Sequence, residues 1–141
     1  MQFDRPSADE IYTHLVNGGS YKKHPRLLIK KDEVAKLKSR IETNPELRRI
    51  LNSVINSANQ YFEKEPVKWA LDAAQLRIFS QCDEVKIRLF DLCTVYLLTG
   101  DEKYAERAWV EIENACNWKD WNVTMHFLDS GEIGPGIAYA Y

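Results

Sequence analysis

Apolar residues at helical spacing divide most of the chain into segments with clear ends. The clearest segment begins at Asn44, a good N-cap, and Pro45 takes the first helical position, where its missing N–H is not needed. Its apolar stripe consists of Leu47, Ile50, Leu51, Val54, Ile55, Ala58, Tyr61 and Phe62. Residues three, four and seven apart share one helix face, so this spacing predicts an amphipathic helix that Pro66 closes.

Two further helices are predicted on either side of Thr99-Gly100-Asp101. Apolar residues predict a buried face over 83–98, and Gly100 follows as a C-terminal stop. Asp101 then caps a helix whose stripe comprises Tyr104, Ala105, Ala108, Trp109, Ile112 and Ala115. So short a connection favours antiparallel neighbours, which predicts a helical hairpin.

The other segments are less sharply defined. A helix is predicted from Asp32 as N-cap, with an apolar face of Val34, Leu37 and Ile41. Between Val67 and Ser80 the composition permits a helix through Ala70, Leu71, Ala73, Ala74 and Leu76.

The N-terminal part is predicted to be largely irregular. Ile11, Leu15 and Val16 form a short amphipathic stretch, and Asn17-Gly18-Gly19 should stop it with a glycine in the left-handed conformation. Pro25 favours an extended His24, so the segment 21–29 is predicted to be a surface strap.

These elements define the fold class and the domain organisation. No run alternates apolar and polar residues over more than a few positions, and no Asn-Gly or Asp-Gly pair stands between two such runs, so no β-hairpin is predicted. The prediction is an all-α protein built from antiparallel helical hairpins. It has an irregular N-terminal strap with a short helix over 1–31 and a helical domain over 32–141.

Composition excludes several classes of function. The sequence is 45% hydrophobic and 28% charged, with a net charge of −2, which fits a globular domain without a basic face for nucleic acid. No apolar stretch approaches the roughly 20 residues of a membrane span, and no signal peptide is visible. Cys82, Cys93 and Cys116 lack zinc-ligand spacing, and Cys93 lies on an apolar stripe that predicts a buried thiol. No metal and no cofactor is predicted.

The segment after Cys116 carries the candidate chemistry. Trp118, Trp121 and Asn122 stand among Lys and Asp, a pattern typical of carbohydrate-binding surfaces, where flat rings contact sugar faces beside hydrogen-bonding groups. The alternative is that both rings plug a gap between helices. His126 and Asp129 would share a helix face with Ser130, Ile133 and Ile137. That pair is interpreted as a structural hydrogen bond, with an acid–base couple as the alternative.

The last segment contains residues that disfavour a regular helix. Either the helix kinks at Pro135, or Gly134 caps a helix that starts there. Gly131, Gly134 and Gly136 predict close approach of another helix or a ligand. The segment ends without a stop signal, so we expect a truncated helix whose apolar face, formed by Ile133, Ile137 and Tyr141, needs a partner outside this chain.

Three stretches together resemble the N-terminal helical region of the heparinase II/III-like polysaccharide lyases. They are His24-Pro25-Arg26-Leu27-Leu28, the run Tyr96 to Ala108 around Thr-Gly-Asp, and Trp121-Asn122 followed by His126-Phe127-Leu128-Asp129, Glu132 and the tail Ile137-Ala138-Tyr139-Ala140-Tyr141. The sequence departs from the family pattern at Ile78-Phe79-Ser80-Gln81 and at Gly134-Pro135-Gly136.

This resemblance implies the first part of an incomplete α/α toroid, followed in the family by β-sandwich domains. Such proteins are periplasmic or secreted and cleave uronic-acid-containing polysaccharides by β-elimination. That reaction needs a base, an acid and a group that neutralises the substrate carboxylate. The family's catalytic residues match no position here, so no catalytic residue is predicted.

The resemblance thus gives the sequence-based hypothesis for function. The partners it implies are an acidic polysaccharide and downstream domains of the same chain. Trp118, Trp121, Asn122 and His126 are the predicted substrate-binding residues. The alternatives are a non-enzymatic helical-repeat interaction module and, less favoured, a hydrolase that uses Asp129 and Glu132.

Overall fold

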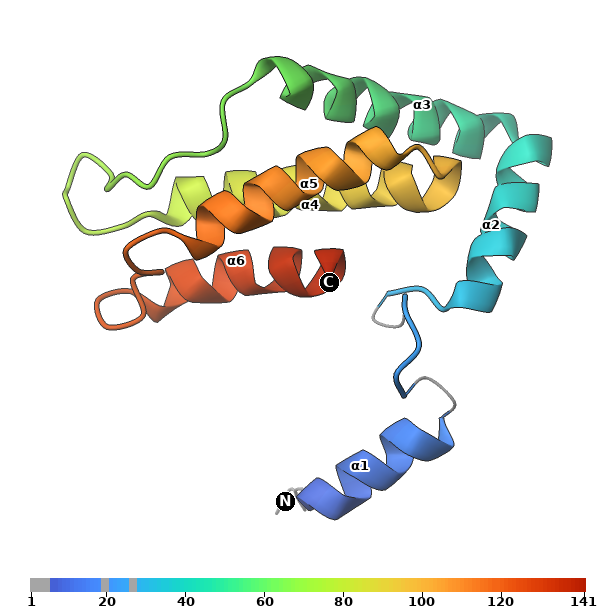
Figure 1. The fold of residues 1–141 in the computed structure, drawn as a ribbon, viewed down its shortest axis with the longest axis horizontal. Helices are drawn as coiled ribbons and strands as arrows, with labels where there is room; N and C mark the ends of the chain where they lie inside the picture. The colour runs from blue at the N-terminus through green and yellow to red at the C-terminus, as the bar shows by residue number, and fades with distance from the viewer. Residues whose placement is uncertain (1–5, 19–20, 26–27) are drawn as a thin grey trace. The chain divides into compact units, whose positions relative to one another are not determined.

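The computed structural model describes residues 6–18, 21–25 and 28–141. Every regular element in these residues is helical, which confirms the all-α class (Figure 1). The elements are α1 (Ala8–Asn17), α2 (Lys31–Thr43), α3 (Pro45–Gln60), the short 3-10 helix η1 (Tyr61–Glu63), α4 (Phe79–Thr99), α5 (Glu102–Cys116) and α6 (Phe127–Ala140). Contacts divide the chain into two compact units, Met1–Ser39 and Arg40–Tyr141, with the division inside α2.

The first unit contains the predicted short helix, α1. The hydroxyl of Ser7 accepts from the N–H of Glu10, and the Glu10 carboxylate accepts from the N–H of Ser7, at 3.2 and 2.7 Å. The Ser7 N–H also lowers the pKa of Glu10. The predicted left-handed stop is wrong for Gly18, because its N–H still bonds to the His14 carbonyl in right-handed conformation. Gly19 and, in the predicted strap, Arg26 and Leu27 lie outside the described residues.

The start of α2 also differs from the prediction. The helix begins at Lys31, so Asp32 lies in its first turn and is not the N-cap. The Glu33 carboxylate accepts from the N–H of Lys30 at 2.8 Å, and this bond stabilises the helix start. The N-cap prediction at Asp32 thus identified the correct region of the chain, but it placed the first residue of the helix too late.

The first helix that lies wholly in the second unit is α3, where the prediction from Asn44 and Pro45 is confirmed. The Asn44 Oδ1 accepts from the N–H groups of Glu46 and Leu47 at 2.9 and 3.1 Å. The hairpin of α4 and α5 is confirmed as well: Gly100 adopts φ 76°, and Asp101 accepts from the N–H of Lys103. Figure 1 shows the two helices side by side in opposite directions.

The helix that the composition permits between Val67 and Ser80 is absent up to Ile78, and only Phe79 and Ser80 are helical, as the first residues of α4. The segment between η1 and α4 contains a tight turn in which the Asp72 Oδ1 accepts from the N–H groups of Leu76 and Arg77 at 3.0 and 3.3 Å. The Leu76 bond lowers the pKa of Asp72. Gln75 has φ 58°, which is incompatible with a continuing right-handed helix.

The last helix, α6, packs against α4 and runs parallel to it (Figure 1). It continues through Pro135, so the alternative of a new helix capped by Gly134 is wrong. A Cβ on Gly136 would lie 2.8 Å from the Cα of Lys86, which confirms the predicted close approach at this glycine. No other helix approaches Gly131 or Gly134, because a Cβ there meets no atom within 4 Å, and the alternative of a ligand at these two glycines stays a prediction.

One hydrophobic core joins α3, α4, α5 and α6. Its largest fully buried apolar side chains are Ile78, Leu89, Leu92 and Ile133. The predicted bare face of α6 is therefore wrong in part, because Ile133 is buried and Ile137 packs against the core, while Tyr141 is 85% exposed. The partner of this face is α4 of the same chain.

Candidate functional site

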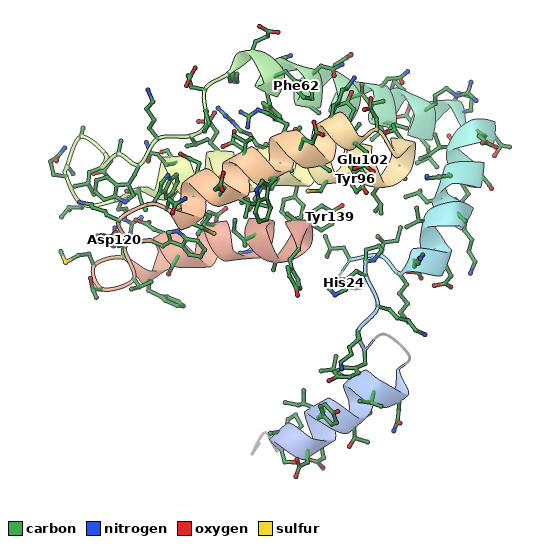
Figure 2. All side chains as sticks on the ribbon, viewed as in Figure 1. His24, Phe62, Tyr96, Glu102, Asp120 and Tyr139 are labelled. Atoms are coloured by element: carbon green, nitrogen blue, oxygen red, sulfur yellow. The ribbon has the colours of Figure 1, made fainter. Side chains whose placement is uncertain are left out.

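Two loops meet at one end of the helical unit and bring the predicted site together. They are the segment 64–78 before α4 and the segment 117–126 between α5 and α6 (Figure 1). The indole N–H of Trp69 donates to the Asp120 carbonyl at 3.2 Å, and the Asn122 amide donates to the Leu76 carbonyl at 2.8 Å. Figure 2 labels Asp120 at this end, which we call the loop end.

Three tryptophans gather at the loop end. Trp118 and Trp121 follow the C-terminus of α5, and Trp69 comes from the other loop. All three rings are half-buried and pack against the core. The rings thus act partly as packing, as the alternative proposed, and still expose part of their surface. Their role in sugar binding stays a prediction.

The indole N–H groups of the two predicted tryptophans have different environments. Trp121 donates to the Ala115 carbonyl at 2.9 Å, which ties its ring to the end of α5. The buried Nε1 of Trp118 has no hydrogen-bond partner among the described residues. A buried donor of this kind is uncommon in folded proteins.

The side chain of Asn122 forms hydrogen bonds that stabilise the fold. The residue has φ 59°, and its amide donates to both the Leu76 carbonyl and the Asp129 Oδ2 at 2.8 Å. Asn tolerates the left-handed region better than most residues, which explains the choice of residue type at this position. Asn122 therefore shapes the loop, and any contact with a ligand would fall to the atoms that these bonds leave unused.

His126 and Asp129 do not form the interpreted structural pair. The carboxylate of Asp129 is fully buried and accepts from the N–H of Ile78 at 2.9 Å as well as from Asn122. His126 is half-buried and precedes α6, and its backbone carbonyl accepts from the N–H of Asp129. The link between the two residues is thus a backbone bond, because Asp129 turns its side chain toward α4.

The charged groups at the loop end are of both signs. The ammonium of Lys119 lies 3.6 Å from the centroid of the Trp69 ring, a cation–π contact. Lys68 and Asp120 are also exposed on these loops. The loop end therefore presents aromatic surface beside exposed positive and negative groups.

The two carboxylates of the hydrolase alternative are engaged elsewhere. Glu132 pairs with Lys86, which also pairs with Asp83 at 2.9 Å, and Asp129 is enclosed by Ile78 and Asn122. Each residue thus has a structural role between α4 and α6. In the described part of the chain, no group of three metal-ligating side chains comes together.

Two residues at or near the loop end were missed by the sequence analysis. Trp69 lies next to Lys68, the same combination of residues as at Trp118 and Lys119, and this likeness could have identified it. Glu111 is fully buried at the centre of a charged network, and no local pattern distinguishes it from an ordinary helical glutamate.

Comparisons with known proteins were made on the whole chain. No protein-family model matches it, and a search of curated proteins finds no significant match. In the described ranges, no helix has the length and hydrophobicity required to cross a membrane.

Proposed function

We propose that the unit Arg40–Tyr141 forms part of an α/α toroid in a polysaccharide lyase-like protein and contributes glycan contacts at its loop end. The glycan is of the uronic-acid-containing class, and the chemistry of β-elimination belongs to residues outside this chain. The observation that carries the proposal is the gathering of Trp69, Trp118 and Trp121 beside Lys119 and Asp120. Sugar rings present apolar C–H faces and hydroxyls, which such a surface can contact.

The arrangement of the helices also supports this proposal. A toroid is assembled from antiparallel helical hairpins, and α4 with α5 is such a hairpin. The loop end is rigidly built, because Asp129 and Asn122 connect the start of α4, the second loop and α6. Rigid support of this kind reduces the conformational entropy that is lost when a ligand binds.

Titration calorimetry with alginate, hyaluronan and heparan sulfate oligosaccharides tests the proposal. We expect binding that Trp118→Ala and His126→Ala weaken while both variants stay folded, with a lower melting temperature for Trp118→Ala because its ring packs against the core. Trp109→Ala is the matched control, because Trp109 is 61% exposed in the middle of α5. Absence of binding to all three glycans would contradict the proposal.

A second assay concerns catalysis. We expect no increase in the absorbance of unsaturated uronate when the chain is incubated with these glycans, since the residues for proton transfer are proposed to lie elsewhere. Turnover that survives purification would contradict this part of the proposal.

One observation favours the alternative of a protein-interaction module. The outer side of α6 is uncharged and exposed, with Phe127 77% exposed and Leu128, Gly131, Pro135 and Ala138 along the same helix. Exposed apolar surface often marks an interaction site. If Trp118→Ala unfolds the protein and no glycan binds, the interaction module becomes the better account.

A further inference from the structure

A buried network of charged side chains lies on the inner side of the segment 64–78, away from the solvent. The carboxylate of Glu111 on α5 is fully buried, and its Oε1 accepts from Arg88 of α4 at 2.5 Å and from Arg107 of α5 at 2.8 Å. The Glu84 carboxylate also pairs with Arg88 at 2.5 Å. Two guanidinium groups and two carboxylates balance in charge. Burial opposes the charged form of Arg88, but Glu111 and Glu84 outweigh it and raise its pKa.

The network holds the backbone of one short stretch of chain. Arg107 donates to the carbonyls of Tyr61 and Lys64 at 2.9 and 3.1 Å, and Arg88 donates to the carbonyl of Glu65 at 2.9 Å. The carbonyls of Lys64 and Glu65 follow η1 and lie outside any helix, so the guanidinium groups supply the hydrogen bonds that a regular element would otherwise provide. The network therefore fixes the path of the backbone over residues 61–65, in addition to joining α4 to α5.

The same α5 face holds both polar backbone groups of Val67. Its N–H donates to the Oε2 of Glu111 at 3.2 Å, and its carbonyl accepts from the amide of Asn114 at 2.6 Å. Val67 is buried, Lys68 is exposed and Trp69 is half-buried, the alternation expected of an extended chain. Trp69 then reaches the Asp120 carbonyl just beyond the end of α5. The stretch from Val67 to Trp69 is thus held by successive hydrogen bonds to Glu111, Asn114 and Asp120.

From this geometry we infer that Glu111 and Asn114 are positioning residues for Trp69. They fix the backbone two residues before the ring, so that Trp69 lies beside Lys119 and Asp120 at the loop end. This inference rests on the proposed function in assigning Trp69 to the glycan-contacting surface. Neither residue touches the ligand.

The test uses three variants on one helix. Asn114→Ala removes the bond to the Val67 carbonyl and leaves all charges in place. Glu111→Gln removes the charge that two arginines share. Glu113→Gln is the matched control, because Glu113 is exposed on the same helix. The measurements are hydrogen exchange of the segment 64–70, the NMR resonance of the Trp69 indole N–H, helix content and glycan affinity.

We expect Asn114→Ala to shift the Trp69 indole resonance and to speed exchange over 64–70 with unchanged helix content. Glycan affinity should fall about fivefold, the typical effect of one hydrogen bond. Glu111→Gln should have larger effects in the same direction, and Glu113→Gln none. If Glu111→Gln does not fold, the inference is tested by the results for Asn114→Ala alone.

An unchanged Trp69 resonance and unchanged exchange in Asn114→Ala would overturn the inference. These two readouts need no ligand. If the wild-type chain binds no glycan, the proposed function therefore fails, while the positioning of Trp69 is still tested separately.

Discussion

The Oδ2 of Asp129 accepts a hydrogen bond from the backbone N–H of Ile78 at 2.9 Å, which joins the first turn of α6 to the start of α4. The Asn122 amide donates to the same oxygen at 2.8 Å, so one fully buried carboxylate connects two helices and a loop. The Oδ1 atom has no hydrogen-bond partner among the described residues. Ile78 directly precedes Phe79, the first residue of α4, so the bond fixes the chain at the point where the helix begins.

Asp129→Ala should destabilise the unit Arg40–Tyr141. The substitution leaves the N–H of Ile78 and the amide of Asn122 without their acceptor, which costs about 1–3 kcal/mol for a buried donor. Urea unfolding followed by circular dichroism measures the loss. The control is Glu106→Gln on the exposed side of α5, for which we expect a change within about 0.5 kcal/mol. An Asp129→Ala midpoint equal to that of the wild type would show that the carboxylate does not hold these elements together.

Two glycines of α6 should respond in opposite directions to the same substitution. Gly136→Ala places a Cβ 2.8 Å from the Cα of Lys86, so α4 and α6 must separate, and we expect a loss of about 1–3 kcal/mol. Gly131→Ala meets no atom within 4 Å and should stabilise the helix by about 0.5–1 kcal/mol. Thermal unfolding of both variants gives the comparison. Equal effects would mean that α6 does not approach α4 at Gly136.

Local signals account for the parts of the fold that the sequence predicts well. Asn44, Gly100 and Asp101 act on backbone groups within a few residues, so their roles are visible in the sequence itself. The segment 64–78 is different, because its partners lie on α5 and α6. The bonds from Val67 to Glu111 and from Ile78 to Asp129 join residues 44 and 51 positions apart, and no local pattern announces them.

The three cysteines should differ in reactivity toward a thiol reagent at pH 8. Burial raises the pKa of the Cys82 thiol to about 12, with a further contribution from the charge of Asp129, and burial raises that of Cys93 to about 11. Cys116 is exposed at the end of α5. We expect one thiol to react rapidly in the native protein and the other two only on unfolding. Cys82 is buried, whereas Cys93, predicted to be buried, is half-buried. Cys116→Ser should abolish the rapid phase, and a rapid phase that persists would show that a reagent reaches Cys82 or Cys93 in the native protein.

Asp91 should make part of the stability dependent on pH. Burial raises the pKa of Asp91, and the hydrogen bond from the Tyr61 hydroxyl at 2.7 Å opposes this only in part. The folded state therefore binds the proton more tightly than the unfolded state. Its contribution to stability is present at low pH and is lost as the pH rises from the ordinary carboxylate pKa through the raised one.

Asp91→Asn removes this titration and retains an acceptor for Tyr61. We expect the variant to be more stable than the wild type at pH 7, with the difference vanishing at a pH below the ordinary carboxylate range. Urea unfolding at a series of pH values measures it, with Glu106→Gln as control. A wild type that is the more stable of the two at pH 7 would show that the charged form of Asp91 is favoured by the fold.

The candidate site illustrates what residue type can and cannot predict. The sequence identified the segment of Trp118 and Trp121 from its composition, and the structure brings both to the loop end with Trp69. It did not foresee that the Asn122 amide bonds to Leu76 and Asp129, because those partners come from other elements. Side-chain chemistry thus indicates a class of surface, while the fold decides which atoms are free to contact a ligand.

The four tryptophan indole N–H resonances provide the most direct test of glycan contact at the loop end. Each is assigned by a single Trp→Phe substitution and followed in NMR spectra during titration with an alginate, hyaluronan or heparan sulfate oligosaccharide. We predict that the resonances of Trp69 and Trp118 shift with saturation, while that of Trp109, exposed in the middle of α5, stays in place. If none of the four shifts, or if only Trp109 does, the loop end is not a glycan-contacting surface.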